Sequence, residues 1–220
     1  QGKPTKAAQG FARSCGVAVN ELDRSAKGGV EKLAFLSKEP GKPTQDLLPR
    51  LVQDAIAQLP IPKRMRWGAS REEFVRPVHW AVMLFGQEII PAVLLGVEVD
   101  RFSYGHRFSA NKKIIINSAK DYEELLEEKG GVIPDFKKRK DLIRQLVEDE
   151  GSGAGGTAVI DEALLDEVTS LVEYPVALTG QFEEEFLEVP PEALILTMKS
   201  HQKCFYLVDK KDKLLPKFIT

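Results

Sequence analysis

VHWAVMLFGQEIIPAVLL, residues 78–95, forms most of the longest apolar run in this 220-residue chain, and it decides the fold. Gly86-Gln87 divides the run, which predicts two strands, residues 78–85 and 89–95, joined by a tight hairpin turn. Pro91 cannot donate a ladder hydrogen bond, so the second strand is expected at a sheet edge or to carry a bulge. The interruptions also leave the run short of the ~20 apolar residues that a membrane helix needs, so no membrane contact is predicted.

Helical patterns surround these strands. An apolar stripe from Leu47 to Leu59 predicts a helix that begins near Thr44 and stops at Pro60. Further helices are predicted at 118–128, 135–149, 161–172 and 191–199, and further strands at 30–37, 114–116, 203–208 and 214–219. Strands and helices neither alternate regularly nor segregate, which indicates an α+β fold with a mixed or mainly antiparallel sheet and packed helices. Residues 1–28 are predicted to be a small helical appendage that breaks at Gly28-Gly29, and residues 29–220 the main module.

Composition excludes several classes of protein. The formal net charge is only -2, so any contact with nucleic acid must come from local basic patches and not from a strongly basic body. The two cysteines, Cys15 and Cys204, fit no metal or disulfide pattern and predict reduced thiols in a cytoplasmic protein. The chain begins without Met, and residues 217–220 resemble a strand cut in mid-course, so we expect a fragment of a longer protein.

Motifs for catalysis or metal binding are weak. GSGAGG, residues 151–156, matches the G-x-G-x-x-G pattern but follows a charged helix and not a strand, so it is predicted to be a flexible linker between helices. His79, His106 and His201 are isolated in the sequence, and no pair of ligands has zinc-binding spacing, so no metal site is predicted. Without a nucleophile elbow or a phosphate-binding loop, the sequence predicts no catalytic residue and no cofactor in this chain.

Three stretches combine cations with flat rings, a pattern typical of contact with unpaired RNA. IPKRMRWG, residues 61–68, places three cations beside Trp67, although Trp67 is equally suited to anchor a core while the cations are solvated. RFSYGHRF, residues 101–108, surrounds Gly105, which is expected to take a positive φ; the alternative is an aromatic-anchored loop with His106 bound to backbone groups. TMKSHQK, residues 197–203, ends a predicted helix, where its cations could instead complement the helix dipole.

Five stretches together resemble the β subunit of bacterial glycyl-tRNA synthetase: MRWG at 65–68, FVRPVH at 74–79, GHRF at 105–108, VIPDF at 132–136 and TMKSHQK at 197–203. Their order and spacing also fit, and the resemblance covers essentially the whole chain. It implies an ATP-dependent α2β2 ligase in which the α subunit activates glycine and the β subunit supplies tRNA-binding modules. It also implies that the main module is similar to the editing-type module of phenylalanyl-tRNA synthetase β chains.

The partners that the resemblance implies are tRNA(Gly) and the synthetase α subunit, which uses the ATP. The expected role is to contact the acceptor arm of the tRNA and guide its end toward the α subunit, while the fragment itself has no catalytic activity. Two alternatives stay open: a purely structural scaffold of the β subunit, and an active or vestigial hydrolase that edits mischarged tRNA. The residues predicted to contact RNA are Lys63, Arg64, Arg66, Trp67, Arg76, Arg101, His106, Arg107, Phe108, Lys199 and Lys203.

Overall fold

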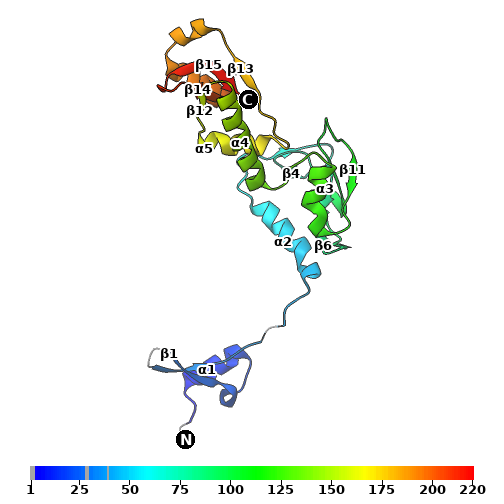
Figure 1. The fold of residues 1–220 in the computed structure, drawn as a ribbon. Helices are drawn as coiled ribbons and strands as arrows, with labels where there is room; N and C mark the ends of the chain where they lie inside the picture. The colour runs from blue at the N-terminus through cyan, green and yellow to red at the C-terminus, as the bar shows by residue number, and fades with distance from the viewer. Residues whose placement is uncertain (1–2, 28–29, 39) are drawn as a thin grey trace. The chain divides into compact units, whose positions relative to one another are not determined.

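The computed structural model describes residues 3–27, 30–38 and 40–220. The chain divides into two compact units, Gln1–Leu47 and Leu48–Thr220. The first unit holds the helix α1 (Lys6–Cys15), the short 3-10 helix η1 (Val19–Glu21) and an antiparallel hairpin of β1 (Asp23–Lys27) and β2 (Val30–Ala34) (Figure 1). The predicted break and domain boundary at Gly28-Gly29 lie outside the described residues. β1 and β2 pair with each other, so both belong to the first unit, and the two compact units divide after Leu47.

The helix α2 (Thr44–Gln58) confirms the predicted apolar stripe. Its Leu48, Val52 and Ile56 pack against a small core of Met83, Ile90 and Leu94. This core is the point at which the helix covers the strands formed by residues 78–95.

The apolar run 78–95 forms four short strands: β5 (Ala81–Val82), β6 (Leu84–Phe85), β7 (Glu88–Ile89) and β8 (Val93–Leu94). The predicted turn is confirmed, because β6 and β7 pair as a hairpin around Gly86, whose φ is 63°. The two long strands expected there are each interrupted, the second at Pro91, which has no N–H for a ladder. β9 (Val97–Asp100) pairs in parallel with β5 and antiparallel with β8, and β10 (Phe102–Tyr104) pairs antiparallel with β11 (Lys113–Ile115).

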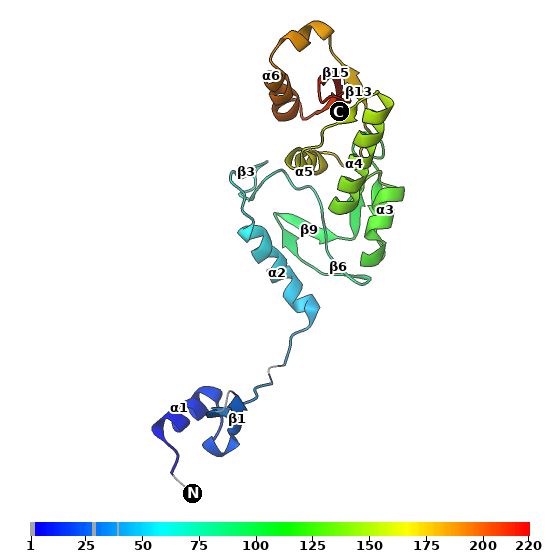
Figure 2. The same cartoon turned by 60° about the vertical axis from the view of Figure 1, so that its left-hand side comes forward.

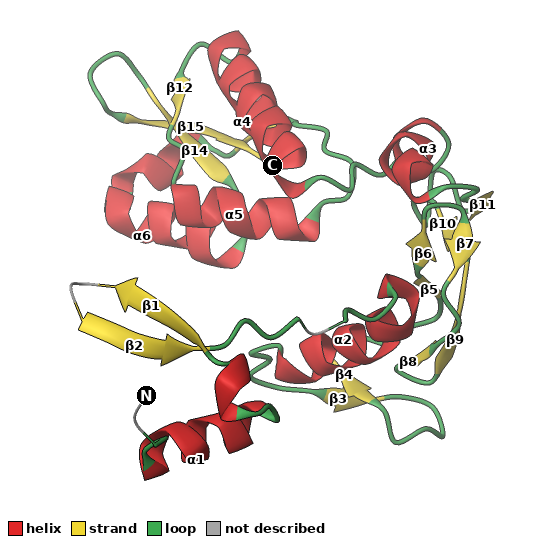
Figure 3. Ribbon diagram, turned by 90° about the horizontal axis from the view of Figure 1, so that it is seen from below, coloured by secondary structure: helices red, strands yellow, loops and turns green. Residues whose placement is uncertain are grey.

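After the short helices η2 (Ala119–Asp121) and α3 (Tyr122–Glu128), the chain builds a second core. Here α4 (Phe136–Gly153) and α5 (Glu162–Leu171) lie side by side, joined by the ion pairs of Lys140 and Arg144 with Glu162 (Figure 2). Both helices pack on a four-stranded sheet of order β12-β14-β15-β13 (Figure 3). Its strands are β12 (Thr157–Ala158), β13 (Thr179–Gln181), β14 (Phe205–Val208) and β15 (Leu214–Ile219). The last two confirm the strands predicted at 203–208 and 214–219, and they pair with each other as an antiparallel hairpin.

The remaining described elements are the strands β3 (Met65–Arg66) and β4 (Glu73–Phe74), the 3-10 helix η3 (Glu184–Glu188), α6 (Pro191–Leu196) and the π-helical turn η4 (Thr197–His201). All strand pairs in the described residues are antiparallel except β5 with β9, so the α+β class with mainly antiparallel pairing is confirmed. None of the described helices is long and apolar enough to cross a membrane.

The glycine-rich stretch 151–156 is not a flexible linker. α4 continues through Gly153, and a Cβ on the buried Gly151 would lie 3.0 Å from the backbone N of Ala158. A Cβ on Gly156 would lie 2.6 Å from the Leu215 side chain. Close packing therefore explains Gly151 and Gly156, which the bare pattern did not reveal, whereas a Cβ on Gly153 or Gly155 would meet open space.

Candidate nucleic-acid interface

The first basic stretch, residues 61–68, is largely tied into the fold. Arg64 donates hydrogen bonds to the carbonyl oxygens of Ala57 (2.9 Å) and Leu59 (3.4 Å), at the end of α2. Arg66 pairs with Glu73 at 2.6 Å across the β3–β4 hairpin. Trp67 is half-buried and Lys63 is exposed. Arg66 therefore has an acidic partner, whereas Arg64 is held by carbonyl oxygens and Lys63 has no ion pair within the described residues.

Arg76 follows β4 and is exposed. Its guanidinium donates to the carbonyl oxygen of the neighbouring Val75 at 3.2 Å. A hydrogen bond to the adjacent residue does not neutralise the charge, so Arg76 keeps a free cation at the surface.

The third stretch, residues 197–203, is paired with acidic side chains of α5 and its N-cap. Lys199 contacts Asp161 at 2.6 Å and Lys203 contacts Glu167 at 2.9 Å. The hydrogen bond from Lys199, together with the Leu164 amide at the N-terminus of α5, lowers the pKa of Asp161. These lysines therefore connect the segment after α6 to α5, a role that neither the RNA nor the helix-dipole interpretation anticipated.

The second stretch differs from the other two. Residues 101–113, here called the cationic segment, contain the cations Arg101, Arg107, Lys112 and Lys113 and no acidic residue. Across the described residues, none of these four cations takes part in an ion pair. Arg101 donates to the carbonyl oxygen of Gln87 at 3.2 Å, which leaves its charge unneutralised.

Flat rings accompany these cations. The Tyr104 ring lies 4.8 Å from the Trp80 ring and 5.9 Å from the Phe102 ring, between centroids. Lys113 places its ammonium 3.6 Å from the centroid of Phe102. Phe108 is 89 % exposed, so its ring is presented almost entirely to solvent.

A cavity of about 510 Å³ opens beside these rings. Here called the Trp80–Tyr104 cavity, it is lined by the rings of Trp80, Phe102 and Tyr104 and by the polar side chains of His79, Arg107 and Asn111. A lining of rings with a few polar groups is typical of small-molecule and nucleotide sites.

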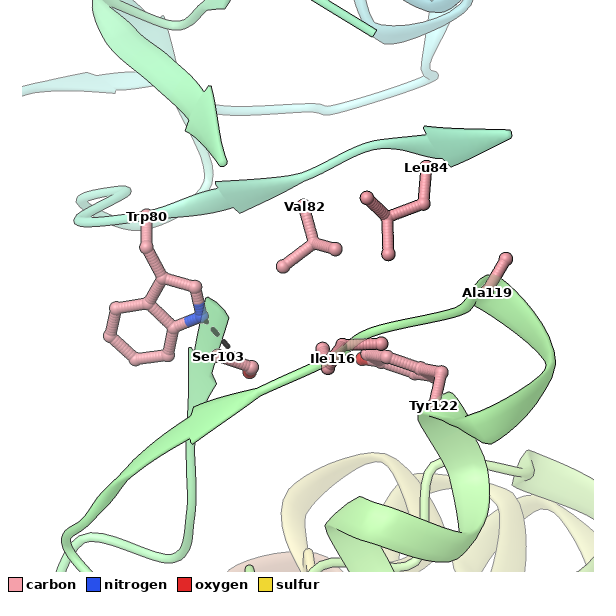
Figure 4. A pocket seen from close by; sticks show the side chains of 7 residues that line it. All are labelled: Trp80, Val82, Leu84, Ser103, Ile116, Ala119 and Tyr122. Carbon is pink, nitrogen blue, oxygen red and sulfur yellow. Dashed lines mark hydrogen bonds between the residues drawn. The ribbon is translucent and has the colours of Figure 1, made fainter. Parts of the chain in front are cut away.

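A second cavity, of about 440 Å³, shares only Trp80 with the first (Figure 4). Successive side chains of a strand point to opposite faces, so Ser103 faces this cavity while Phe102 and Tyr104 face the other. Trp80 donates its indole N–H to Ser103 Oγ at 3.2 Å, and burial raises the pKa of Tyr122 in the same wall. The lining contains neither a carboxylate nor an imidazole, so it offers no general base to activate water.

Gly105 fixes the path of the cationic segment. It does not have the positive φ expected from the sequence. Instead, a Cβ at this position would lie 2.7 Å from both the Cα and the carbonyl oxygen of Gly130, directly after α3. The adjacent His106 amide donates to that same carbonyl at 2.6 Å, and His106 Nδ1 lies 2.9 Å from Ser109 Oγ.

The predicted RNA-contacting residues thus fall into three groups. The cationic segment holds Arg101, His106, Arg107 and Phe108. On or near β3 and β4 lie Lys63, Arg64, Arg66, Trp67 and Arg76, and against α5 lie Lys199 and Lys203. Sequence reasoning missed His79, Trp80, Tyr104, Asn111, Lys112 and Lys113. The absence of any acid over residues 101–113 was the signal that could have identified the longer segment. No group of three His, Cys, Asp or Glu side chains within the described ranges is placed to hold a metal ion.

Comparison with known proteins gives a consistent answer. The model of the family "Glycyl-tRNA synthetase beta subunit" matches residues 1–220. A glycine–tRNA ligase beta subunit from Hahella chejuensis is 52% identical over 219 residues, which is 100% of this chain and 32% of the relative. Beta subunits from Ectopseudomonas mendocina and Chromohalobacter salexigens are each 51% identical over 219 residues, again 100% of this chain and 31% and 32% of the relatives. The chain therefore spans about a third of the length of these curated relatives.

Proposed function

The chain belongs to the family of glycyl-tRNA synthetase beta subunits, and we propose that it contacts tRNA(Gly) through the cationic segment. In this proposal the segment meets the acceptor arm and helps position its end for glycylation in the α subunit. The α subunit binds the ATP, and the cytoplasmic holoenzyme is α2β2. The similarity of residues 29–220 to the editing-type module of phenylalanyl-tRNA synthetase β chains stays a prediction.

The observation that carries the proposal is the unpaired charge of residues 101–113. These residues include four cations and no acid, none of the four takes part in an ion pair within the described residues, and rings able to stack on bases lie beside them. Cations that neutralise phosphates release counterions, so binding through them weakens as salt rises. Arg66, Lys199 and Lys203 would first have to leave their carboxylate partners, which makes them poorer phosphate ligands.

The test uses the holoenzyme with a full-length β subunit and compares tRNA(Gly) affinity over a range of salt concentrations. Arg107→Glu with Lys112→Glu should raise Kd about tenfold or more at moderate salt. The slope of log K against log salt should become shallower by about 1.4 to 1.8, as expected for two lost phosphate contacts. Lys210→Glu with Lys211→Glu, two exposed cations of the β14–β15 turn, makes the same change in net charge and should leave the slope unchanged. An equal effect of both pairs would mean that only total charge matters, and the proposal would fail.

Nuclease footprinting of tRNA(Gly) on the holoenzyme tests the acceptor arm separately. Protection of the acceptor arm should weaken in the Arg107→Glu, Lys112→Glu enzyme, while anticodon protection persists. Protection confined to the anticodon in both enzymes would contradict the acceptor-arm assignment.

A scaffold role is the second candidate function, and it is favoured by the ion pairs of the first and third basic stretches. Arg66 with Glu73, and Lys203 with Glu167, connect elements of this chain to one another. If charge reversal at Arg107 and Lys112 left both affinity and footprint unchanged, the structural role would be the better explanation of the whole module.

A further inference from the structure

We infer that the Trp80–Tyr104 cavity binds one unpaired nucleotide of an RNA strand. The inference rests on the proposed function and goes further: the proposed function assigns phosphate contacts to the cationic segment, and the inference assigns a class of ligand to the cavity beside it. The cationic segment would meet the backbone of the strand, and the cavity would hold a single base that has left the stack.

The rings supply the stacking surface. Tyr104 lies between Trp80 and Phe102, at centroid distances of 4.8 and 5.9 Å. All three rings line the cavity, and because Lys113 covers one face of Phe102, Trp80 and Tyr104 are the rings that we expect to stack on a base. A volume of about 510 Å³ lies within the range of small-ligand sites, so it suits one nucleotide and not a duplex.

The polar lining selects a nucleotide over a purely apolar group. Arg107, Asn111 and His79 face the cavity, and none of these side chains donates or accepts a hydrogen bond within the described parts of the chain, so all are available to a ligand. A guanidinium binds phosphate, and an amide offers a donor and an acceptor that match a base edge. An apolar ligand would bury these groups without partners, at a cost in free energy.

The lining also disfavours a cationic ligand, and the residues around it favour a strand over a free nucleotide. The lining contains no carboxylate, and it includes the cation Arg107. A mononucleotide has the same ring and phosphate chemistry. However, only a strand supplies further phosphates for Arg101, Lys112 and Lys113, which continue the positive charge along β10 and β11.

The test uses the holoenzyme and two probes: a short RNA duplex with a single-stranded 3′ overhang, and the same duplex with blunt ends. Tyr104→Leu should lower affinity for the overhang probe about tenfold and leave blunt-duplex affinity within about twofold, because only an unpaired base can stack in the cavity. Tyr104→Phe keeps the ring and should restore overhang binding. Asn111→Ala removes an exposed side chain, so it does not disturb packing, and should weaken overhang binding about fivefold.

Tyr122→Leu is the matched control, because it makes the same change in the other cavity (Figure 4) and should affect neither probe. If Tyr104→Leu and Asn111→Ala both leave overhang affinity unchanged, the nucleotide site is refuted, even where Arg107→Glu with Lys112→Glu weakens both probes and so supports the proposed function. If charge reversal weakens neither probe, the proposed function itself fails. AMP should compete poorly with the overhang probe, and displacement by AMP as efficient as by the overhang strand would overturn the choice of a strand.

Discussion

Gly105→Ala should disrupt the cationic segment more than any other single methyl addition near it. The new Cβ would lie 2.7 Å from the Cα and carbonyl oxygen of Gly130, where ordinary contact begins at 3.4 Å, and it would also meet the carbonyl oxygen of Ala110. These obstacles are backbone atoms, which cannot rotate away as the end of a side chain can. The segment must therefore move at least about 0.7 Å away from the turn after α3, as judged from those two distances, and Gly105 must also shift relative to Ala110, whose carbonyl oxygen is closer still.

Two effects add up in the expected cost. Overpacking in a filled site costs about 1–3 kcal/mol. The displacement also stretches the hydrogen bonds from the Gly105 amide to Lys112 (3.2 Å) and from the His106 amide to Gly130 (2.6 Å), each contributing about 1 kcal/mol. The local free energy of opening should fall by about 3–5 kcal/mol, which corresponds to a loss of amide protection of at least about 100-fold.

Hydrogen exchange measured by mass spectrometry on the full-length β subunit reports this opening, through peptides that cover residues 101–113. Gly153→Ala is the matched control, because a Cβ there has no neighbour within 4 Å and the residue lies in α4. Because Gly153 is the last residue of α4, the substitution should change the stability of the helix little and leave the protection of residues 101–113 unaltered. If Gly105→Ala changed protection of the segment by less than about threefold, the close approach to Gly130 would not determine its position and the reasoning would be refuted.

Three further predictions concern the remaining contacts. Arg66→Gln with Glu73→Gln should leave the Kd for tRNA(Gly) within about twofold in filter binding, because the pair contributes little net charge, and a tenfold loss would contradict this. Arg139→Met should lower the free energy of unfolding in urea by about 2–4 kcal/mol, because the Arg139 guanidinium bridges carbonyl oxygens before α4 and at the end of α5. A loss below about 0.5 kcal/mol would contradict this prediction. Because the pKa of Asp161 is lowered, its stabilising pair with Lys199 is fully present above the ordinary carboxyl pKa of about 3.9 and is lost as the pH falls through the lowered value. In urea titrations, the difference in stability between the wild type and Asp161→Asn should therefore vanish at low pH. A difference that does not depend on pH would refute the assignment.

Local sequence patterns were enough to predict an element where a few neighbouring residues determine its structure. Gly86 alone supplies the positive φ of the β6–β7 turn, and the stripe of α2 was visible because helical spacing repeats along the chain. The breaks in the expected long strands were harder to foresee. They depend on which strand each segment meets: Ala81 and Val82 pair with β9, whereas Leu84 and Phe85 pair with β7.

The candidate site could be predicted only in part, because the sequence does not show which cations have partners. Arg66, Lys199 and Lys203 matched the RNA-binding pattern as well as Arg107 did. Their carboxylates come from elsewhere in the chain: Glu73 is seven residues away, and Asp161 is separated from Lys199 by 38. Gly105 shows the same limit, since the close approach to Gly130 that requires a glycine is a tertiary contact and not a local conformation.

The distribution of free charge also limits what this region can do for a synthetase. If all four cations of residues 101–113 met phosphates, the slope of log K against log salt from this segment would be only about -2.8 to -3.6, depending on whether the RNA is single- or double-stranded. A protein that holds nucleic acid mainly by charge makes about 6–10 such contacts. The segment is therefore too small to supply most of the affinity for tRNA. In the proposed function it would instead place one part of the RNA, with its unpaired base, after other surfaces have bound the rest. Variants of the Trp80–Tyr104 cavity should accordingly lower the rate of glycylation by more than they weaken overall tRNA binding, and an equal loss in both would indicate that the cavity serves only as an additional anchor.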